Sequence, residues 1–245
     1  MLVRAEHLQA GYAPGQPVVR GVEFAVAAGQ AVAVLAPNGG GKTTLFRTLL
    51  GELPPLGGTF AVDGTIAAVH QHDHARLDFP VSALDVALMG AYGRTPWWRR
   101  IAGADRAAAR AALDRVGLAD REGTHFGSLS GGQRRRVMIA RAIVQDARIL
   151  LLDEPFAGVD RASEERILTV LEDLAAEGRT LLIATHDVEQ SRRWDRVLCL
   201  NGRQIAFGAP EETLTAPTLA ATYGPELVVL REGRMGLTIQ HHDHP

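Results

Sequence analysis

A glycine-rich loop ending in a lysine is the stretch of this sequence best suited to chemistry. The loop, Pro37–Gly41, separates an apolar run, Ala31–Leu35, from a helical pattern that continues through Leu50. Backbone N–H groups of such a loop, at the start of a helix, suit a phosphate. Lys42 would reach the outer phosphates, and the hydroxyl of Thr43 would bind a magnesium ion. The lysine is the only one among the 26 Lys and Arg residues, and its compact ammonium fits a crowded phosphate pocket better than a guanidinium would.

The loop follows the P-loop pattern G-x-x-x-x-G-K-[ST] except at its first position, where Ala36 stands. We expect alanine to be tolerated there if its φ is negative. The competing interpretation, a glycine turn without a special role, is disfavoured because strand, loop, lysine and helix come in the right order. The residues expected to bind the phosphates are Asn38, Gly39, Gly40, Gly41, Lys42, Thr43 and Thr44.

A pair of adjacent acids follows a second apolar run, Ile149–Leu152. Carboxylates at the carboxyl end of a parallel strand lie at the rim where ligands of such sheets bind. Asp153 would hold the magnesium, and Glu154, on the other side of the pleat, would orient a water. The alternative is that the two acids only cap a following turn.

Three further residues lie near predicted strands and could take part in binding a nucleotide. His186 follows the apolar run Leu181–Ala184 and could reach a γ-phosphate, although a histidine here could also be an ordinary surface residue. Tyr12 lies in a loop and could stack on a nucleotide base or simply pack at the rim. Gln71 ends another apolar run and could join the water shell of a metal.

A second helix start able to receive an anion lies at Leu129–Gln133, where Ser130 is a suitable N-cap and two glycines follow. The arginine run after it, Arg134–Arg136, is interpreted as a solvated helix face. A contact with an acidic partner is the alternative.

The remaining pattern predicts an α/β fold. Loose alternation over Leu2–Leu8 and Val18–Val26 predicts short strands with one buried face. Asp63-Gly64 and Asn201-Gly202 each lie between apolar runs, which is a hairpin signal. The alanine-rich stretch from Ser82 to Arg121 predicts a helical insertion. Helices are also predicted after Ser130 and over 162–176.

Composition limits the classes of function. With 46% hydrophobic and 22% charged residues over 245 positions, the chain is an ordinary globular protein. A net charge of −2 gives no reason to expect nucleic acid as a partner. Cys199 is the only cysteine, so a reducing compartment is the simpler expectation. We see no export segment and no run long enough to span a bilayer, so any membrane-spanning helices would come from a partner.

Taken together, these motifs resemble the nucleotide-binding subunit of ATP-binding cassette (ABC) transporters, from Val3 to about Tyr223. The sequence LSGGQ at 129–133, between a P-loop and an Asp-Glu strand end, carries most of the specificity. The resemblance assigns Tyr12 to the adenine-stacking loop, Ala36–Thr44 to the P-loop, Gln71 to the Q-loop, Asp153 and Glu154 to the Walker B end, Asp160 to the D-loop, and His186 to the switch histidine.

The resemblance also implies an architecture and a set of partners. The fold would be a P-loop NTPase core with a parallel-sheet RecA-like subdomain, an N-terminal antiparallel β subdomain and an inserted helical subdomain at about 80–145. The ATPase domain would cover 1–225, and 226–245 would be a short extension with a histidine-rich tail. Integral membrane permease subunits, and indirectly an extracytoplasmic solute-binding protein, would be partners. The chain would be cytoplasmic and peripheral on the inner face of the membrane.

In the implied mechanism, two copies pack head to tail around ATP and Mg²⁺. Each γ-phosphate would meet the opposite copy through Ser130, Gly131, Gly132, Gln133 and Asp160. Glu154, His186 and Gln71 would carry catalysis, with Thr43, Gln71 and Asp153 around the magnesium.

The segments Asp78–Gly90 and Phe156–Asp160 resemble the manganese, zinc and iron importer branch. Importers of siderophores, haem or cobalamin are close rivals. Two other classes are less consistent with the motifs: a soluble cassette ATPase that acts on nucleic acid or ribosomes, and a nucleotide-binding module that does not hydrolyse ATP. Two histidine groups could bind metal but more simply face a partner or solvent: His70, His72, Asp73 and His74, and His241, His242, Asp243 and His244. Trp97 and Trp98 cover a helix end or contact a partner.

Overall fold

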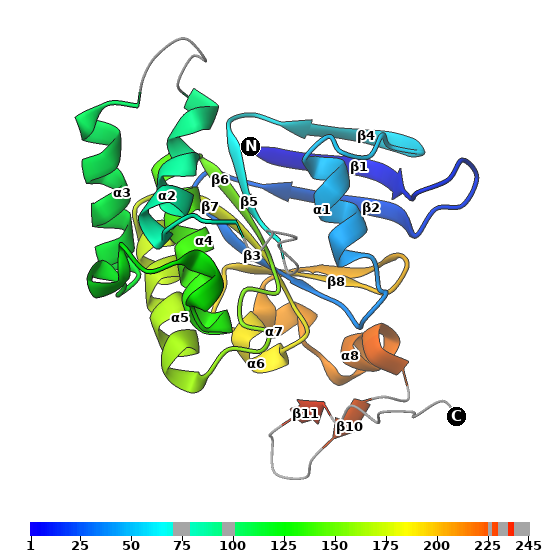
Figure 1. The fold of residues 1–245 in the computed structure, drawn as a ribbon. Coiled ribbons are helices and arrows are strands. Elements are labelled where there is room, and N and C mark those ends of the chain that lie inside the picture. Colours follow the sequence, from blue (N-terminus) through cyan, green and yellow to red (C-terminus); the bar gives the residue numbers. More distant parts are fainter. Residues whose placement is uncertain (71–78, 95–100, 225–226, 230–234, 238–245) are drawn as a thin grey trace, which may run out of the picture. The chain divides into compact units, whose positions relative to one another are not determined.

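The computed structural model describes residues 1–70, 79–94, 101–224, 227–229 and 235–237 (Figure 1). The chain divides into two compact units. The first combines Met1–Asp63 with Leu182–Pro245, and the second is Gly64–Leu181. Each unit contains part of the predicted chemistry, so each is described separately.

An antiparallel sheet forms the first part of unit one. Strand β1 (Val3–Ala10) lies between β2 (Val19–Val26) and β4 (Gly57–Val62). Alternate residues of β1 and β2 are buried, as the period of two predicts. The register is interrupted in the middle of β1, where His7 has a φ of 47°. The predicted half-buried strands are therefore confirmed.

A second sheet in unit one positions the glycine loop. Its strands follow the order β7-β3-β8-β9, in which β3 (Ala31–Leu35) is parallel to β8 (Arg196–Leu200) and β9 (Gln204–Gly208) is antiparallel to β8. All five residues of β3 are buried. The predicted hairpin at Asn201-Gly202 is confirmed. The other elements of unit one are α1 (Lys42–Leu49), α6 (Val188–Ser191), α7 (Pro210–Thr213), α8 (Ala216–Tyr223), β10 (Leu227–Val229) and β11 (Met235–Leu237).

Unit two contains parallel strands and the predicted helical insertion. The strand order is β5-β6-β7, with β5 (Ile66–Val69) parallel to β6 (Ile149–Asp153) and β7 (Thr180–Thr185) beginning here. Its helices are α2 (Ala83–Leu88), η1 (Met89–Arg94), α3 (Gly103–Arg115), η2 (Ala119–Arg121), η3 (Phe126–Ser128), α4 (Gly131–Gln145) and α5 (Arg161–Ala176). Helices α2, α3 and α4 pack together. In the part of the chain that the structure describes, no helix combines the length and apolar character needed to cross a membrane.

The hairpin predicted at Asp63-Gly64 is wrong. Strand β4 pairs with β1, whereas β5 pairs in parallel with β6, so the two strands around this turn belong to different sheets. The turn at Asp63-Gly64 therefore leads from a strand of one sheet to a strand of the other and joins no antiparallel pair. Parallel pairing with the fully buried β6 covers Ala67 and Val69, which are each 1% exposed.

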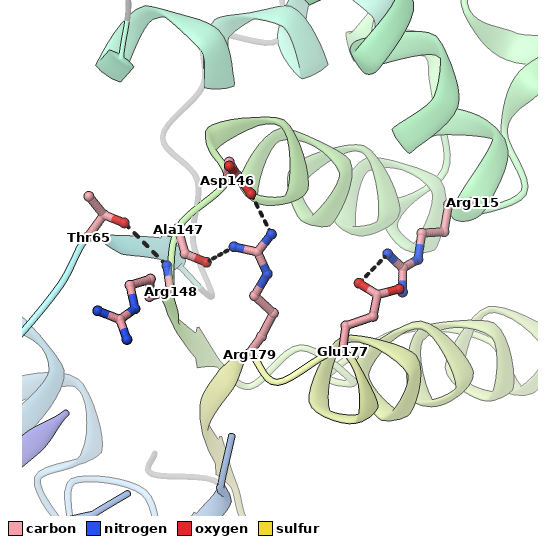
Figure 2. Close-up of polar contacts among 7 residues, drawn as sticks. All are labelled: Thr65, Arg115, Asp146, Ala147, Arg148, Glu177 and Arg179. Atoms are coloured by element: carbon pink, nitrogen blue, oxygen red, sulfur yellow. Dashed lines mark hydrogen bonds and ion pairs between the residues drawn. The ribbon is translucent and has the colours of Figure 1, made fainter. Parts of the chain in front are cut away.

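Polar contacts fix the ends of several unit-two elements (Figure 2). Arg179, just before β7, donates to the carbonyl of Ala147 at 2.7 Å and pairs with Asp146, the left-handed residue that ends α4. Arg115, the last residue of α3, pairs with Glu177 at the end of α5, with a nitrogen–oxygen distance of 2.7 Å. Helices α3 and α4 are thus tied to the elements that follow β6.

Candidate functional site

The glycine loop of unit one has two positions in a conformation that glycine adopts readily. Gly39 and Gly41 have φ values of 76° and 102°, which disfavour residues with side chains. A Cβ added at Gly41 would also lie 2.3 Å from Cγ2 of Val19. Ala36 is fully buried and is not among the described residues with positive φ, so alanine is accommodated on the expected condition.

The Lys42 side chain folds back over the loop. Its ammonium donates to the carbonyls of Ala36 at 2.8 Å and Pro37 at 3.3 Å, and the residue is only 5% exposed. These hydrogen bonds hold the ammonium beside the loop, where it could meet a phosphate bound there.

Tyr12 lies next to the helix that follows this loop. The Thr44 hydroxyl donates to the Tyr12 phenol oxygen at 3.4 Å, while Thr44 itself is 4% exposed. The tyrosine is 58% exposed, so its ring has accessible surface on which a base could stack. The structure therefore brings together two residues that the sequence separates by 32 positions.

His186 follows β7 in a loop held by its neighbours. Asp187 accepts hydrogen bonds from the backbone N–H groups of Glu189 and Gln190 and caps α6. The Tyr223 hydroxyl donates to the carbonyl of His186 at 3.1 Å. Tyr223 was assigned no role from the sequence, because nothing in its local pattern reveals a contact across 37 positions. His186 itself is half-buried.

The paired acids of unit two are both buried. Asp153 ends β6 and is 4% exposed, and Glu154 is 7% exposed. Glu154 has a φ of 49°, a left-handed conformation that is uncommon for a residue with a side chain and is concentrated at functional sites. Its carbonyl accepts from the N–H of Ala157 at 3.1 Å, which closes the turn after the strand.

Helix α4 begins at the sequence LSGGQ with a capping box. The Ser130 hydroxyl accepts from the N–H of Gln133 at 3.2 Å, and the Gln133 side chain accepts from the N–H of Ser130 at 2.9 Å. This confirms the predicted N-cap. Ser130 and Gly131 are exposed, so the first turn of the helix is open to a ligand from outside the unit.

The second glycine of this turn packs against the start of α5. A Cβ added at Gly132 would lie 2.7 Å from Oγ of Ser163 and 3.3 Å from Oδ2 of Asp160. Asp160 caps α5 by accepting from the N–H of Ser163 at 2.9 Å, and this hydrogen bond is the main reason that the pKa of Asp160 is lowered. The LSGGQ turn and the predicted D-loop are thus packed together within one unit.

The arginine run after LSGGQ is not the solvated face that the sequence suggested. All three side chains are half-buried and donate to backbone carbonyls: Arg134 to Leu129 at 3.0 Å, Arg135 to His70 at 3.0 Å, and Arg136 to Val116 at 2.9 Å. Burial lowers the pKa of Arg136, and the Asp160 carboxylate opposes that shift. Long side chains next to a glycine turn can reach carbonyls that no local pattern identifies.

Several predicted residues lie outside the described part of the chain. These are Gln71, the histidine group His72, Asp73 and His74, the pair Trp97 and Trp98, and the tail His241, His242, Asp243 and His244. Among the described residues, no group of three or more His, Cys, Asp or Glu side chains is arranged to hold a metal ion.

Three comparisons with known proteins all match this chain to ABC transporters or to ATP-binding proteins of transport systems. A family model described as ABC transporter matches residues 19–157. The manganese transport system ATP-binding protein MntB of Bacillus subtilis is 40% identical over 226 residues, covering 89% of this chain and 90% of that protein. The zinc transport system ATP-binding protein TroB of Treponema pallidum is 39% identical over 218 residues, covering 85% and 82%. A solved structure described as a metal-chelate type ABC transporter in an inward-facing conformation is 30% identical, with a TM-score of 0.86 over 98% of each chain.

Proposed function

Because the chain belongs to the ABC transporter family, we propose that this ATPase powers the import of a divalent metal ion, namely manganese, zinc or iron. The observation that carries the cargo class is the 40% identity, over nearly the whole chain, to a manganese transport ATP-binding protein. The zinc system relative supports the same class. A metal chelate, such as a siderophore, haem or cobalamin, is the second candidate, because the chain also resembles a metal-chelate type transporter along its full length.

ATP would be bound by the glycine loop and its neighbours. The amides of Asn38–Gly41 and the Lys42 ammonium would hold the phosphates, with Thr43 and Thr44 at the helix start. The accessible ring of Tyr12 would stack on the adenine. The positive φ values in the loop and the buried lysine support this assignment.

The available oxygen ligands fit Mg²⁺. The Thr43 hydroxyl and the buried Asp153 carboxylate are hard ligands of the kind that magnesium prefers, and Gln71 would add an amide oxygen. Bound there, the ion would neutralise charge on the phosphates.

Hydrolysis requires a residue that orients water and one that supports the transferring group. Glu154, buried in a left-handed turn directly after Asp153, is proposed to orient the attacking water, while His186 would donate to the γ-phosphoryl group. Gln71 would complete the catalytic set.

A second copy of the chain would complete the site. Ser130, Gly131, Gly132 and Gln133 would bind the γ-phosphate of the partner's nucleotide, together with Asp160. The exposure of Ser130 and Gly131 supports this role, because the first N–H groups of a helix can bind an anion that reaches them. The capping box makes the Gln133 side chain a support for Ser130.

Membrane permease subunits are the proposed partners that convert dimerisation into transport, with an extracytoplasmic solute-binding protein as an indirect partner. Phe79 is 59% exposed, Met89 38% and Tyr92 60%, and these apolar side chains lie in and just before the helical insertion. Exposed apolar side chains of this kind suit a protein interface. The chain would then act at the cytoplasmic face of the membrane, with an ATPase domain over 1–225, a helical subdomain at about 80–145 and an extension over 226–245.

The Glu154→Gln variant tests the enzymatic part of the proposal. It keeps the shape of the side chain but not its charge, so hydrolysis should fall at least 100-fold while ATP and Mg²⁺ still bind. The trapped ATP-bound dimer should then elute earlier than the monomer in size-exclusion chromatography. A variant that stays monomeric with ATP and Mg²⁺ would contradict the two-copy model.

The cargo is tested in the assembled transporter. The chain should be purified with its permease and reconstituted in vesicles with the solute-binding protein. ATP-dependent uptake of radiolabelled manganese, zinc and iron is then compared with uptake of iron–siderophore, haem and cobalamin. The Lys42→Ala variant serves as the control without ATP binding. Uptake of a chelate but not of free ions would overturn metal-ion import in favour of the second candidate.

A further inference from the structure

The turn between β8 and β9 contacts the glycine loop. The N–H of Gly202 donates to the carbonyl of Gly40 at 3.2 Å. The turn is closed by the N–H of Asn201 donating to the carbonyl of Arg203 at 2.9 Å, and Gly202 has a φ of 63°. A segment far from the loop in sequence thus holds one of its peptide groups.

The same turn is fixed from its other side. The carbonyl of Gly202 accepts from the N–H of Arg20, at the start of β2, at 3.0 Å. A Cβ added at Gly202 would lie 3.6 Å from the carbonyl oxygen of Val18. The neighbouring Val19 side chain lies directly against Gly41. Strand β2 and the turn therefore support the loop together, and Gly202 cannot shift alone.

The geometry of a trans peptide gives this hydrogen bond a consequence for the next residue. The carbonyl of Gly40 and the N–H of Gly41 belong to one planar group and point in opposite directions. Because the carbonyl points toward Gly202, the N–H of Gly41 points away from it. The residues on both sides of this peptide, Gly40 and Gly41, are glycines, and Gly41 has a positive φ, so the peptide rotates more easily than one between residues with side chains.

We propose that Gly202 is a positioning residue for ATP, because its N–H fixes the peptide between Gly40 and Gly41 so that the Gly41 N–H faces the bound phosphates. The inference rests on the proposed role of this loop in phosphate binding. A loop made of glycines has few side chains with which to hold its own conformation, and an external donor replaces them. The Asn201-Gly202 turn between β8 and β9 then has a second role besides reversing the chain.

The direct test removes one hydrogen-bond donor. Glycolic acid in place of Gly202, introduced by cell-free translation, replaces the N–H with an ester oxygen. The matched control is Gly202→Ala, which keeps the N–H, fits the available space and adds only the strain of a left-handed alanine. A second variant lengthens the turn by one glycine after Gly202, which displaces the donor by ordinary mutagenesis.

Binding of ATP and of inorganic tripolyphosphate is measured by displacement of a fluorescent ATP analogue, and KM and kcat by phosphate release. We expect the ester and the lengthened turn to weaken both ligands roughly three- to ten-fold, the range for one backbone hydrogen bond. KM should rise by the same factor with kcat unchanged, and Gly202→Ala, which keeps the N–H, should weaken binding less than the ester does. Wild-type binding in either the ester or the lengthened turn, or equal losses in the ester and in Gly202→Ala, would overturn the proposal.

A failure of the proposed function would look different. If Lys42→Ala binds ATP as tightly as the wild type, the loop is not the phosphate site, whatever the Gly202 variants do. If Lys42→Ala abolishes binding and the Gly202 variants have no effect, only the positioning role is refuted.

Discussion

Gly132 lies where the LSGGQ turn meets the start of α5, and substituting it by alanine is the sharpest test of that packing. The new Cβ would approach Oγ of Ser163 to 2.7 Å and its Cβ to 2.9 Å, both shorter than carbon contacts in real proteins allow. Asp160, at 3.3 Å, restricts movement to the other side. The Gly132→Ala variant must therefore move the first turn of α4 away from α5.

The magnitude follows from two opposing effects. Overpacking in a tight contact costs about 1–3 kcal/mol. Alanine gains up to about 1 kcal/mol over glycine in a helix, and less in the first turn. The net loss should be about 1–2 kcal/mol, which lowers the unfolding midpoint by about 2–8 °C in a chain of this size. Gly131→Ala is the matched control, because its Cβ would meet nothing closer than the carbonyl of Gly158 at 3.9 Å.

Thermal unfolding followed by circular dichroism measures the loss, and a second substitution tests its cause. Ser163→Gly removes both close atoms, so the double variant should recover about 1 kcal/mol of the Gly132→Ala loss in a double-mutant cycle. Because the turn is displaced, ATP-dependent dimerisation should also weaken in Gly132→Ala. If Gly132→Ala unfolds at the wild-type midpoint, or if Ser163→Gly gives no recovery, the tight contact between the two helix starts does not exist.

Two further predictions concern residues outside the proposed nucleotide site. Burial raises the pKa of Cys199 to about 11, so its thiol stays neutral at pH 8. It should therefore react with a thiol reagent such as DTNB only after the protein unfolds. Rapid labelling of the native protein would contradict the burial of this side chain. Arg179→Met should lower the free energy of unfolding by about 1–2 kcal/mol, because it removes the contacts with Asp146 and Ala147 (Figure 2). The control Arg161→Met removes an ion pair whose arginine is 92% exposed and should be nearly neutral, so equal denaturation midpoints for the two variants would refute the first expectation.

Local sequence was sufficient where one short segment contains the whole signal. The apolar run Ile149–Leu152 predicts a buried strand, and the observed strand β6 covers this run plus one residue. Serine before two glycines predicts an N-cap, and Ser130 caps α4. The position of the glycine loop between a strand and a helix is also predicted from consecutive residue types, although the hydrogen bond that holds the Gly40 carbonyl comes from Gly202.

Local sequence was insufficient to predict the hydrogen bonds of long side chains whose acceptors lie far away in sequence. Arg135 donates to the carbonyl of His70, which lies 65 positions away in sequence. A charged run near a helix start has the same composition whether it faces water or reaches such a carbonyl. The carbonyl becomes a possible acceptor only after β5 has paired with β6 and α4 has packed beside them.

The two aspartate– or asparagine–glycine turns show this limit most directly. Both lie between apolar runs, yet only Asn201-Gly202 joins paired strands. The flanking strands decide the outcome: β8 and β9 pair with each other, whereas β4 and β5 each pair with a different strand. The same non-local contacts that make the Asn201-Gly202 hairpin also bring its N–H to Gly40. A turn signal therefore predicts where the chain can reverse. Whether the chain does reverse there, and which loop the turn contacts, depends on how the flanking strands pair.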